Sequence, residues 1–125
     1  AWIFSTAHPP GVAAAATRGI GLLATEPERR RDLRARAAAF RVALARGGID
    51  TGAAAGQIVP VVTGRAADAV ALAAALAADG FFVPAIRPPS VPPARSLVRA
   101  SVCWQHTADD LERLAAAIIR HAPRG

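Results

Sequence analysis

The sequence has no lysine, methionine or tyrosine, and it has a single cysteine, Cys103. All 15 basic residues are therefore arginine. Without lysine, no side chain of this chain forms a Schiff base, and a phosphate-binding loop of the GxxxxGK type is excluded. One cysteine excludes an internal disulfide and fits a reducing compartment, so we predict a cytoplasmic location.

Long apolar runs and metal-binding spacings are also missing. No stretch reaches the roughly 18 uncharged apolar residues that a membrane-spanning helix needs. The opening Ala1–Phe4 is too short for the core of a signal peptide, and no basic residue precedes it. The three histidines, His8, His106 and His121, lie far apart in the sequence. We therefore predict neither a membrane segment nor a metal site.

The residues that are present describe a folded, basic domain. The chain has 125 residues, of which 53% are hydrophobic and 19% charged, and this composition favours a packed core over disorder. A net charge of +6 would suit a nucleic-acid or anionic-membrane partner. The dense basic run Arg29–Arg36 follows Glu26 and Glu28, however, and contains no aromatic residue to stack on bases. We therefore interpret it as a solvated helix and predict neither partner, with a nucleic-acid-binding module as the alternative.

Hydrophobic spacing and capping signals predict four helices and three short strands. The expected helices span about residues 10–24, 25–46 with Thr25 as N-cap, 65–79, and 107–121 with a capping box at Thr107, and the expected strands span about 58–62, 81–86 and 96–102. This order predicts an α+β domain in which helices cover one face of a three-stranded, mainly antiparallel sheet. Pro60 predicts that the first strand lies at an edge or interrupts the ladder.

Two polar groups on stiff backbone are candidates for a binding site. Four prolines within Pro88–Pro93 restrict the loop before the last strand, and Ser90 is the only hydroxyl in it. Arg99 shares one face of that strand with Leu97 and Ser101, because side chains alternate with period two. A guanidinium on rigid backbone suits a carboxylate. A stiff surface connector and a solvated sheet face are the alternative interpretations.

Two stretches resemble motifs of the α-oxoamine synthases, which are pyridoxal-phosphate enzymes of the fold-type I aminotransferase class. The opening Trp2–Pro10 resembles the start of their C-terminal part. The run Ala85–Pro92, followed by Arg99 and His106-Thr107, resembles their closing motif. The resemblance spans essentially the whole chain. It implies one C-terminal domain, truncated before the cofactor lysine, in which residues 1–10 lead in from a missing large domain and residues 11–125 form the small domain.

The resemblance also implies a reaction and four site residues. The Ile-Arg-Pro-Pro run is most similar to the family member that condenses L-alanine with pimeloyl-CoA or pimeloyl carrier protein in biotin biosynthesis, with pyridoxal phosphate as cofactor. Ser90 and Arg99 match substrate-binding positions, Arg99 at the amino-acid carboxylate. Ser5 and Thr6 match hydroxyls that reach the cofactor phosphate of the neighbouring subunit in a homodimer, although hydroxyls before a helix are ordinarily caps. No catalytic residue falls in this chain, which is expected to be inactive alone.

The match has departures, and three alternatives stay open. Pro93–Ser96 replaces the usual Pro-x-Gly-Thr, and Cys103-Trp104 replaces small residues, so the fine shape of the substrate pocket is not fixed by the resemblance. The first alternative is another α-oxoamine synthase, of the glycine C-acetyltransferase type. The others are the nucleic-acid-binding module and a dimerisation module without a ligand.

Overall fold

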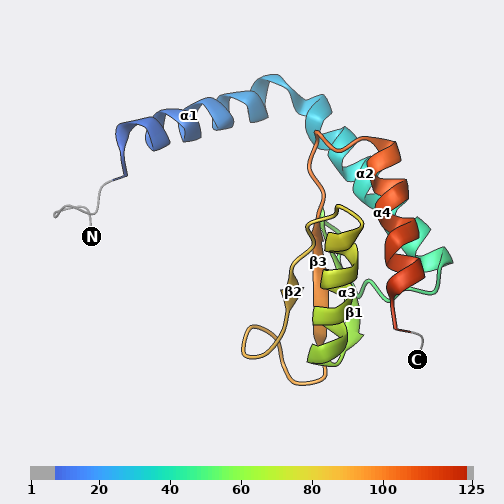
Figure 1. Ribbon diagram of the computed structural model, residues 1–125. Coiled ribbons are helices and arrows are strands. Elements are labelled where there is room, and N and C mark those ends of the chain that lie inside the picture. Colours follow the sequence, from blue (N-terminus) through green and yellow to red (C-terminus); the bar gives the residue numbers. More distant parts are fainter. Residues whose placement is uncertain (1–7, 124–125) are drawn as a thin grey trace. The chain divides into compact units, whose positions relative to one another are not determined.

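A computed structural model describes residues 8–123 and shows the element order that the sequence predicts (Figure 1). The elements are α1 Pro10–Thr25, α2 Pro27–Arg46, β1 Ile58–Gly64, α3 Ala66–Ala78, β2 Ala85–Ile86, β3 Ser96–Ser101 and α4 Ala108–His121. The predicted α+β class is therefore confirmed. Within the described residues, no helix is long and apolar enough to cross a membrane.

The chain divides into two compact units, the first ending at Arg31 and the second beginning at Asp32. In the first unit α1 has no buried residue. Its last residue, Thr25, donates its hydroxyl hydrogen to the carbonyl of Gly21 at 3.1 Å. The prediction that Thr25 caps the second helix is therefore wrong, because its side chain is engaged in the helix that precedes it.

The sheet of the second unit is built around β3. The strand order is β1-β3-β2, and both pairs are antiparallel, as predicted. The even-numbered residues Val98 and Ala100 are buried opposite Val61 and Val59 of β1. They face the helices, and Figure 1 shows α3 lying across this side of the sheet. Arg99 belongs to the other face and is exposed, so the predicted division of β3 into two faces is confirmed.

Pro60 occupies a position where its missing N–H costs no ladder bond. It lies on β1, which is an edge strand, opposite Arg99. The N–H of Arg99 donates to Pro84 on the far side of β3, at 3.0 Å. In an antiparallel pair alternate residues bond to alternate sides, so Pro60 and Arg99 form a non-hydrogen-bonded pair. Of the two positions that Pro60 predicts, an edge strand and an interrupted ladder, the edge strand is confirmed.

The second strand is much shorter than the predicted 81–86. Only Ala85 and Ile86 pair with β3. The end of α3 explains the difference, because Gly80 adopts a left-handed φ of 88° and the N–H of Phe81 donates back to Leu76 at 2.8 Å. The N–H of Phe81 therefore bonds to the C-terminal end of α3 and not to β3.

The capping box at the start of α4 is confirmed. The hydroxyl of Thr107 accepts from the N–H of Asp110 at 3.1 Å, and the carboxylate of Asp110 accepts from the N–H of Thr107 at 2.9 Å. These bonds begin α4 where the chain leaves β3. Leu111 and Ile118 of α4 then complete the core, together with Phe40 and Leu44 of α2.

We predict that Ser96→Ala raises the free energy of unfolding by about 1 kcal/mol. Ser96 is 1% exposed and its hydroxyl has no hydrogen-bond partner among the described residues, so it loses hydration without compensation. Thr63→Val is the matched opposite: it removes the 3.1 Å bond from the Thr63 hydroxyl to the Ser96 carbonyl and should lower stability by about 1 kcal/mol. Urea unfolding measures both. Destabilisation by Ser96→Ala would reveal a bound water at the hydroxyl.

Candidate substrate-carboxylate site

Arg99 is an accessible cation on β3, the central strand of the sheet. Its backbone is fixed between Pro60 and Pro84, while its side chain is exposed. None of the described residues forms an ion pair with its guanidinium. Leu97, two residues before it on the same face, is half-buried. An exposed guanidinium without an acidic partner can present two parallel N–H donors to a carboxylate.

Ser90 lies in the proline loop that leads into β3. Its N–H donates to the carbonyl of Arg87 at 3.0 Å, which closes a turn. Residues 85–90 line a shallow cavity of about 310 Å³. The loop starts beside the Arg99 face, because Ile86 of β2 pairs with Leu97 of β3. No hydrogen bond joins Ser90 to Arg99 in the part of the chain that is described. Arg99 lies two residues beyond Leu97 on the side away from the loop, and it does not line the cavity at residues 85–90.

The predicted cofactor residues, Ser5 and Thr6, lie outside the described residues. Over residues 8–123, no group of three potential metal ligands is found.

Arg36 has a role that its place in the basic run did not reveal. Its Nη1 donates to the carbonyl oxygens of Trp104 at 2.7 Å and His106 at 2.6 Å. The N–H of Cys103 also meets Nδ1 of His106 at 3.2 Å. Arg36 thus fastens the turn between β3 and α4 to α2, and interpreting the whole run as solvated is wrong at this residue. The partners are separated by about 70 positions, so no local spacing predicts the contact.

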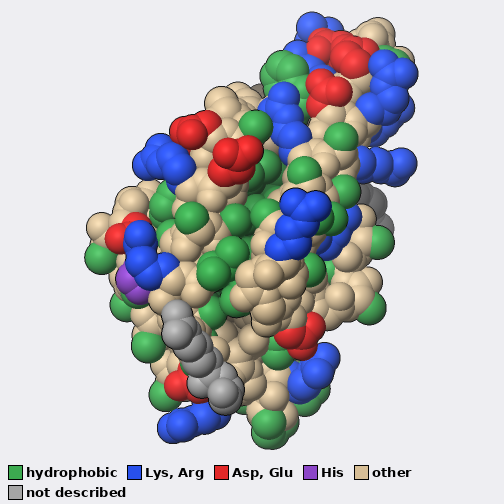
Figure 2. All heavy atoms as spheres, turned by 90° about the vertical axis from the view of Figure 1, so that its right-hand side faces the viewer, with side chains coloured by type: hydrophobic (Ala, Val, Ile, Leu, Met, Phe, Trp, Pro, Cys, Tyr) green, Lys and Arg blue, Asp and Glu red, His purple; other side chains and the backbone are tan. Residues whose placement is uncertain are grey.

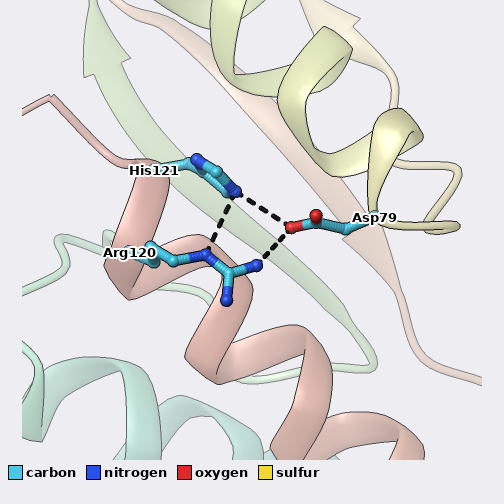
Figure 3. Close-up of polar contacts among 3 residues, drawn as sticks. All are labelled: Asp79, Arg120 and His121. Atoms are coloured by element: carbon cyan, nitrogen blue, oxygen red, sulfur yellow. Dashed lines mark hydrogen bonds and ion pairs between the residues drawn. The ribbon is translucent and has the colours of Figure 1, made fainter.

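A second unpredicted cluster joins the C-terminal ends of α3 and α4 (Figure 3). Oδ2 of Asp79 lies 2.5 Å from Nη2 of Arg120 and 2.9 Å from Nε2 of His121. A carboxylate at the C-terminal end of a helix is disfavoured by the helix dipole, and the two basic side chains compensate it. The hydrogen bonds from Arg120, and then from His121, hold the pKa of the Asp79 carboxyl below its ordinary value.

Positive and negative side chains are mixed on one face of the molecule. On the face drawn in Figure 2, which is the right-hand side of Figure 1, arginine side chains are interspersed with aspartate and glutamate. Hydrophobic side chains run between them, where α2 and α4 border a groove of about 370 Å³ that includes Phe40 and Leu111. The structure thus shows no continuous basic surface on this face.

Solved structures share the fold of the chain. Serine palmitoyltransferase from S. paucimobilis, solved with a bound PLP–myriocin aldimine, has a TM-score of 0.87 and 30% identity to this chain. The match covers 96% of this chain and 31% of the palmitoyltransferase chain. The structure of 8-amino-7-oxononanoate synthase from Francisella tularensis matches 94% of this chain and 34% of its own chain, with a TM-score of 0.78. Because the two sequences are only 20% identical, this match shows the fold alone. The helices and the three-stranded sheet thus form the small α+β domain of a fold-type I PLP enzyme.

Sequence comparison defines the family. The family model described as Aminotransferase class I and II matches residues 1–118, and the chain belongs to this family. The chain is 43% identical over 122 residues to the 8-amino-7-oxononanoate synthase of Anaeromyxobacter dehalogenans (strain 2CP-1). The aligned residues make up 98% of this chain and 31% of the relative. The 8-amino-7-oxononanoate synthase of Geobacter sulfurreducens is 40% identical over 121 residues, which make up 95% of this chain and 31% of that relative. The chain therefore spans under a third of the length of these relatives.

We predict that the Asp79 cluster stabilises the fold in a pH-dependent way. Because the folded pKa is lowered, ionised Asp79 contributes stability above the unfolded value of about 3.9, and this contribution is lost as pH falls through the folded pKa. Asp79→Asn should lower the free energy of unfolding at neutral pH. In acid, the free energies of unfolding of the variant and the parent should become equal. Arg120→Gln should reproduce most of the effect. Urea unfolding at several pH values measures it, and a difference that persists unchanged in acid would contradict it.

Proposed function

We propose that the chain is the C-terminal, substrate-carboxylate-binding part of a PLP-dependent α-oxoamine synthase. The reaction proposed is the condensation of L-alanine with pimeloyl-CoA or pimeloyl carrier protein to 8-amino-7-oxononanoate, with release of CO₂ and the free thiol. One structural observation carries the proposal: Arg99 is exposed on the central strand of the sheet, without an acidic partner among the described residues. The named relatives at 40–43% identity support the choice of reaction.

The proposed roles of these residues come from the family resemblance, and the chemistry of the Arg99 guanidinium supports its role. The guanidinium of Arg99 binds the amino-acid carboxylate, and the rigid β3 backbone fixes the orientation of the amino acid. The hydroxyl of Ser90 contacts the substrate from the loop. Ser5 and Thr6 are proposed to contact the cofactor phosphate of the neighbouring subunit in a homodimer.

The cofactor has no point of attachment among the side chains of this chain, because the sequence lacks lysine. When bound, PLP supplies the electron sink for the reaction. The described residues supply hydrogen-bond donors and positive charge, which suit an anionic group such as the carboxylate of the amino-acid substrate. The lysine is therefore proposed to come from outside these 125 residues, and the chain alone to be inactive.

The serine palmitoyltransferase structures favour a second candidate within the same family, because they match the fold at a TM-score of 0.87. An α-oxoamine synthase that uses another small amino acid would place Arg99 at the same carboxylate. The two candidates differ in the amino acid and the acyl thioester and not in the role of Arg99.

We predict that Arg99→Ala weakens binding of the amino acid by about 2–5 kcal/mol, the range for removing one partner of a desolvated charge pair. A chimera in which this chain replaces the matching segment of the Anaeromyxobacter dehalogenans enzyme allows the measurement. Steady-state kinetics with L-alanine, glycine and L-serine, each with pimeloyl-CoA, should give a strongly raised KM for the preferred amino acid, and the preference separates the two candidates.

Two variants control that experiment. Arg99→Lys keeps the charge but loses the paired donors, so it should fall between the parent and Arg99→Ala. Arg65→Ala removes an exposed arginine whose contact with Asp68 is 3.8 Å long, and it should leave KM unchanged. An unchanged KM in Arg99→Ala would refute the carboxylate role.

We also predict that this chain alone forms no covalent adduct between PLP and any of its side chains. Borohydride reduction after incubation with PLP, followed by peptide mass spectrometry, should locate label at the N-terminal amine at most. A reduced adduct on an internal residue would contradict the proposed division between this chain and the cofactor-bearing part.

A further inference from the structure

Arg99 is the middle member of a row of three residues that crosses the sheet. On one side it pairs with Pro60 of β1. On the other side its N–H donates to the carbonyl of Pro84 at 3.0 Å, one position before the pair between Ala85 of β2 and Val98 of β3. Residues directly opposite each other in antiparallel strands place their side chains on the same face of the sheet. A proline ring therefore flanks the Arg99 side chain on each side.

The other neighbours of Arg99 across the strands are aliphatic. Directly opposite residues have Cβ atoms about 4.5–5.5 Å apart, and the non-hydrogen-bonded pair with Pro60 is of the closer kind. Ile58 and Val62 of β1 and Ile86 of β2 are the diagonal neighbours, at about 7–8 Å. Ile58 is 48% exposed, so this hydrocarbon surface is accessible. Across the strands, Arg99 is therefore surrounded by apolar side chains.

A proline ring cannot compete for the guanidinium. It has no charge and no hydrogen-bonding group, and it is fixed by its bond to the backbone, so it loses almost no conformational freedom when a ligand binds beside it. An acidic residue in the same place would compete, because opposite charges directly across two strands attract each other. Over residues 8–123, no ion pair includes Arg99. The residue types on both sides of Arg99 are consistent with this freedom.

We propose that Pro60 and Pro84 are positioning residues for Arg99, an inference that rests on the function proposed above. The two rings flank the arginine with groups that cannot bind it, and so they leave the guanidinium free for the carboxylate of the amino-acid substrate. They also limit how far the arginine side chain leans across the sheet, because a rigid ring occupies the space on both sides. The prolines act through Arg99 and need no contact with the substrate.

Substitutions at the two prolines keep the hydrogen bonds of β3. Pro60 has no N–H, and its pair with Arg99 is of the non-hydrogen-bonded kind, so its replacement removes no bond of the ladder. Pro84 contributes its backbone carbonyl to Arg99, and every replacement retains that group. Variants at these positions therefore test the side chains that flank Arg99 and not the pairing of the strands.

A charge at position 60 tests the proposal. Pro60→Glu places a carboxylate directly opposite Arg99, where it should capture the guanidinium, and Pro60→Gln is a neutral control of the same shape. In the chimera, Pro60→Glu should raise KM for the preferred amino acid about fivefold, which is equivalent to a cross-strand ion pair of about 1 kcal/mol. Pro60→Gln should raise it about twofold at most. KM for pimeloyl-CoA should stay unchanged in both variants, which a general structural defect would not produce.

Three further variants complete the comparison. Pro60→Val keeps an apolar side chain beside Arg99 and should retain the KM of the parent. Pro84→Glu should act like Pro60→Glu from the other side of β3. Val70→Glu adds the same charge to an exposed position of α3, on the helix-covered side of the sheet, and should leave KM unchanged. Equal effects of Pro60→Glu and Val70→Glu, or of Pro60→Glu and Pro60→Gln, would overturn the proposal.

A second measurement reports on the guanidinium without any substrate. Phenylglyoxal modifies free arginine side chains, and mass spectrometry of peptides from the whole 125-residue chain gives the rate at each arginine. Modification of Arg99 should be several-fold slower in Pro60→Glu than in the parent and in Pro60→Gln. The exposed Arg46 serves as the internal reference and should react equally in all three. An unchanged rate at Arg99 overturns the positioning role.

The two measurements separate failure of this inference from failure of the proposed function. If Pro60→Glu slows the modification of Arg99 but leaves the amino-acid KM unchanged, the carboxylate is bound elsewhere and the proposed function is overturned. If Arg99→Ala raises the amino-acid KM but Pro60→Glu changes neither measurement, the positioning role is overturned and the carboxylate role of Arg99 stands.

Discussion

The pairing of β3 with β1 determines where every other feature of the second unit lies. The register that places Val98 and Ala100 against Val61 and Val59 buries four small aliphatic side chains on one face. The same register commits Arg99 to the opposite face. Because the side-chain period is two, a shift of one residue would bury the guanidinium and expose the core. The same strand register therefore determines both the stability of the core and the accessibility of Arg99.

Much of this arrangement could be predicted from local sequence. The alternation of side chains along β3 predicts that Arg99 and Val98 lie on opposite faces of the sheet. The capping box at Thr107 predicts the start of α4. Such patterns work because they depend on residues within a few positions of one another. The overall α+β order followed for the same reason.

Contacts between distant segments could not be predicted in this way. Arg36 meets the carbonyl of His106 across 70 positions, and Asp79 meets Arg120 across 41. The length of β2 was overestimated because Phe81 has aromatic strand-like character but gives its N–H to the end of α3. Thr25 was misassigned for a related reason, since a hydroxyl that can cap one helix can also bond back into the helix before it.

The exposure of Arg99 bears on how the proposed enzyme would achieve tight binding. A guanidinium and a carboxylate in open water stabilise each other by only about 0–1 kcal/mol. Stronger binding requires that water be excluded from the pair. The chain spans 31% of the length of its named relatives, and in the proposed function the remaining length is what would cover the uncovered face of the sheet around Arg99.

The outer edge of β1 carries a safeguard in its own backbone. Pro60 has no N–H to offer, and the N–H of Val62 is already bonded to the carbonyl of Asp50 at 3.0 Å. A foreign strand approaching this edge therefore finds no N–H donor at Pro60 and one that is already engaged at Val62, which weakens the edge as a template for further pairing. The backbone of β1 itself therefore disfavours the addition of a further strand at this edge.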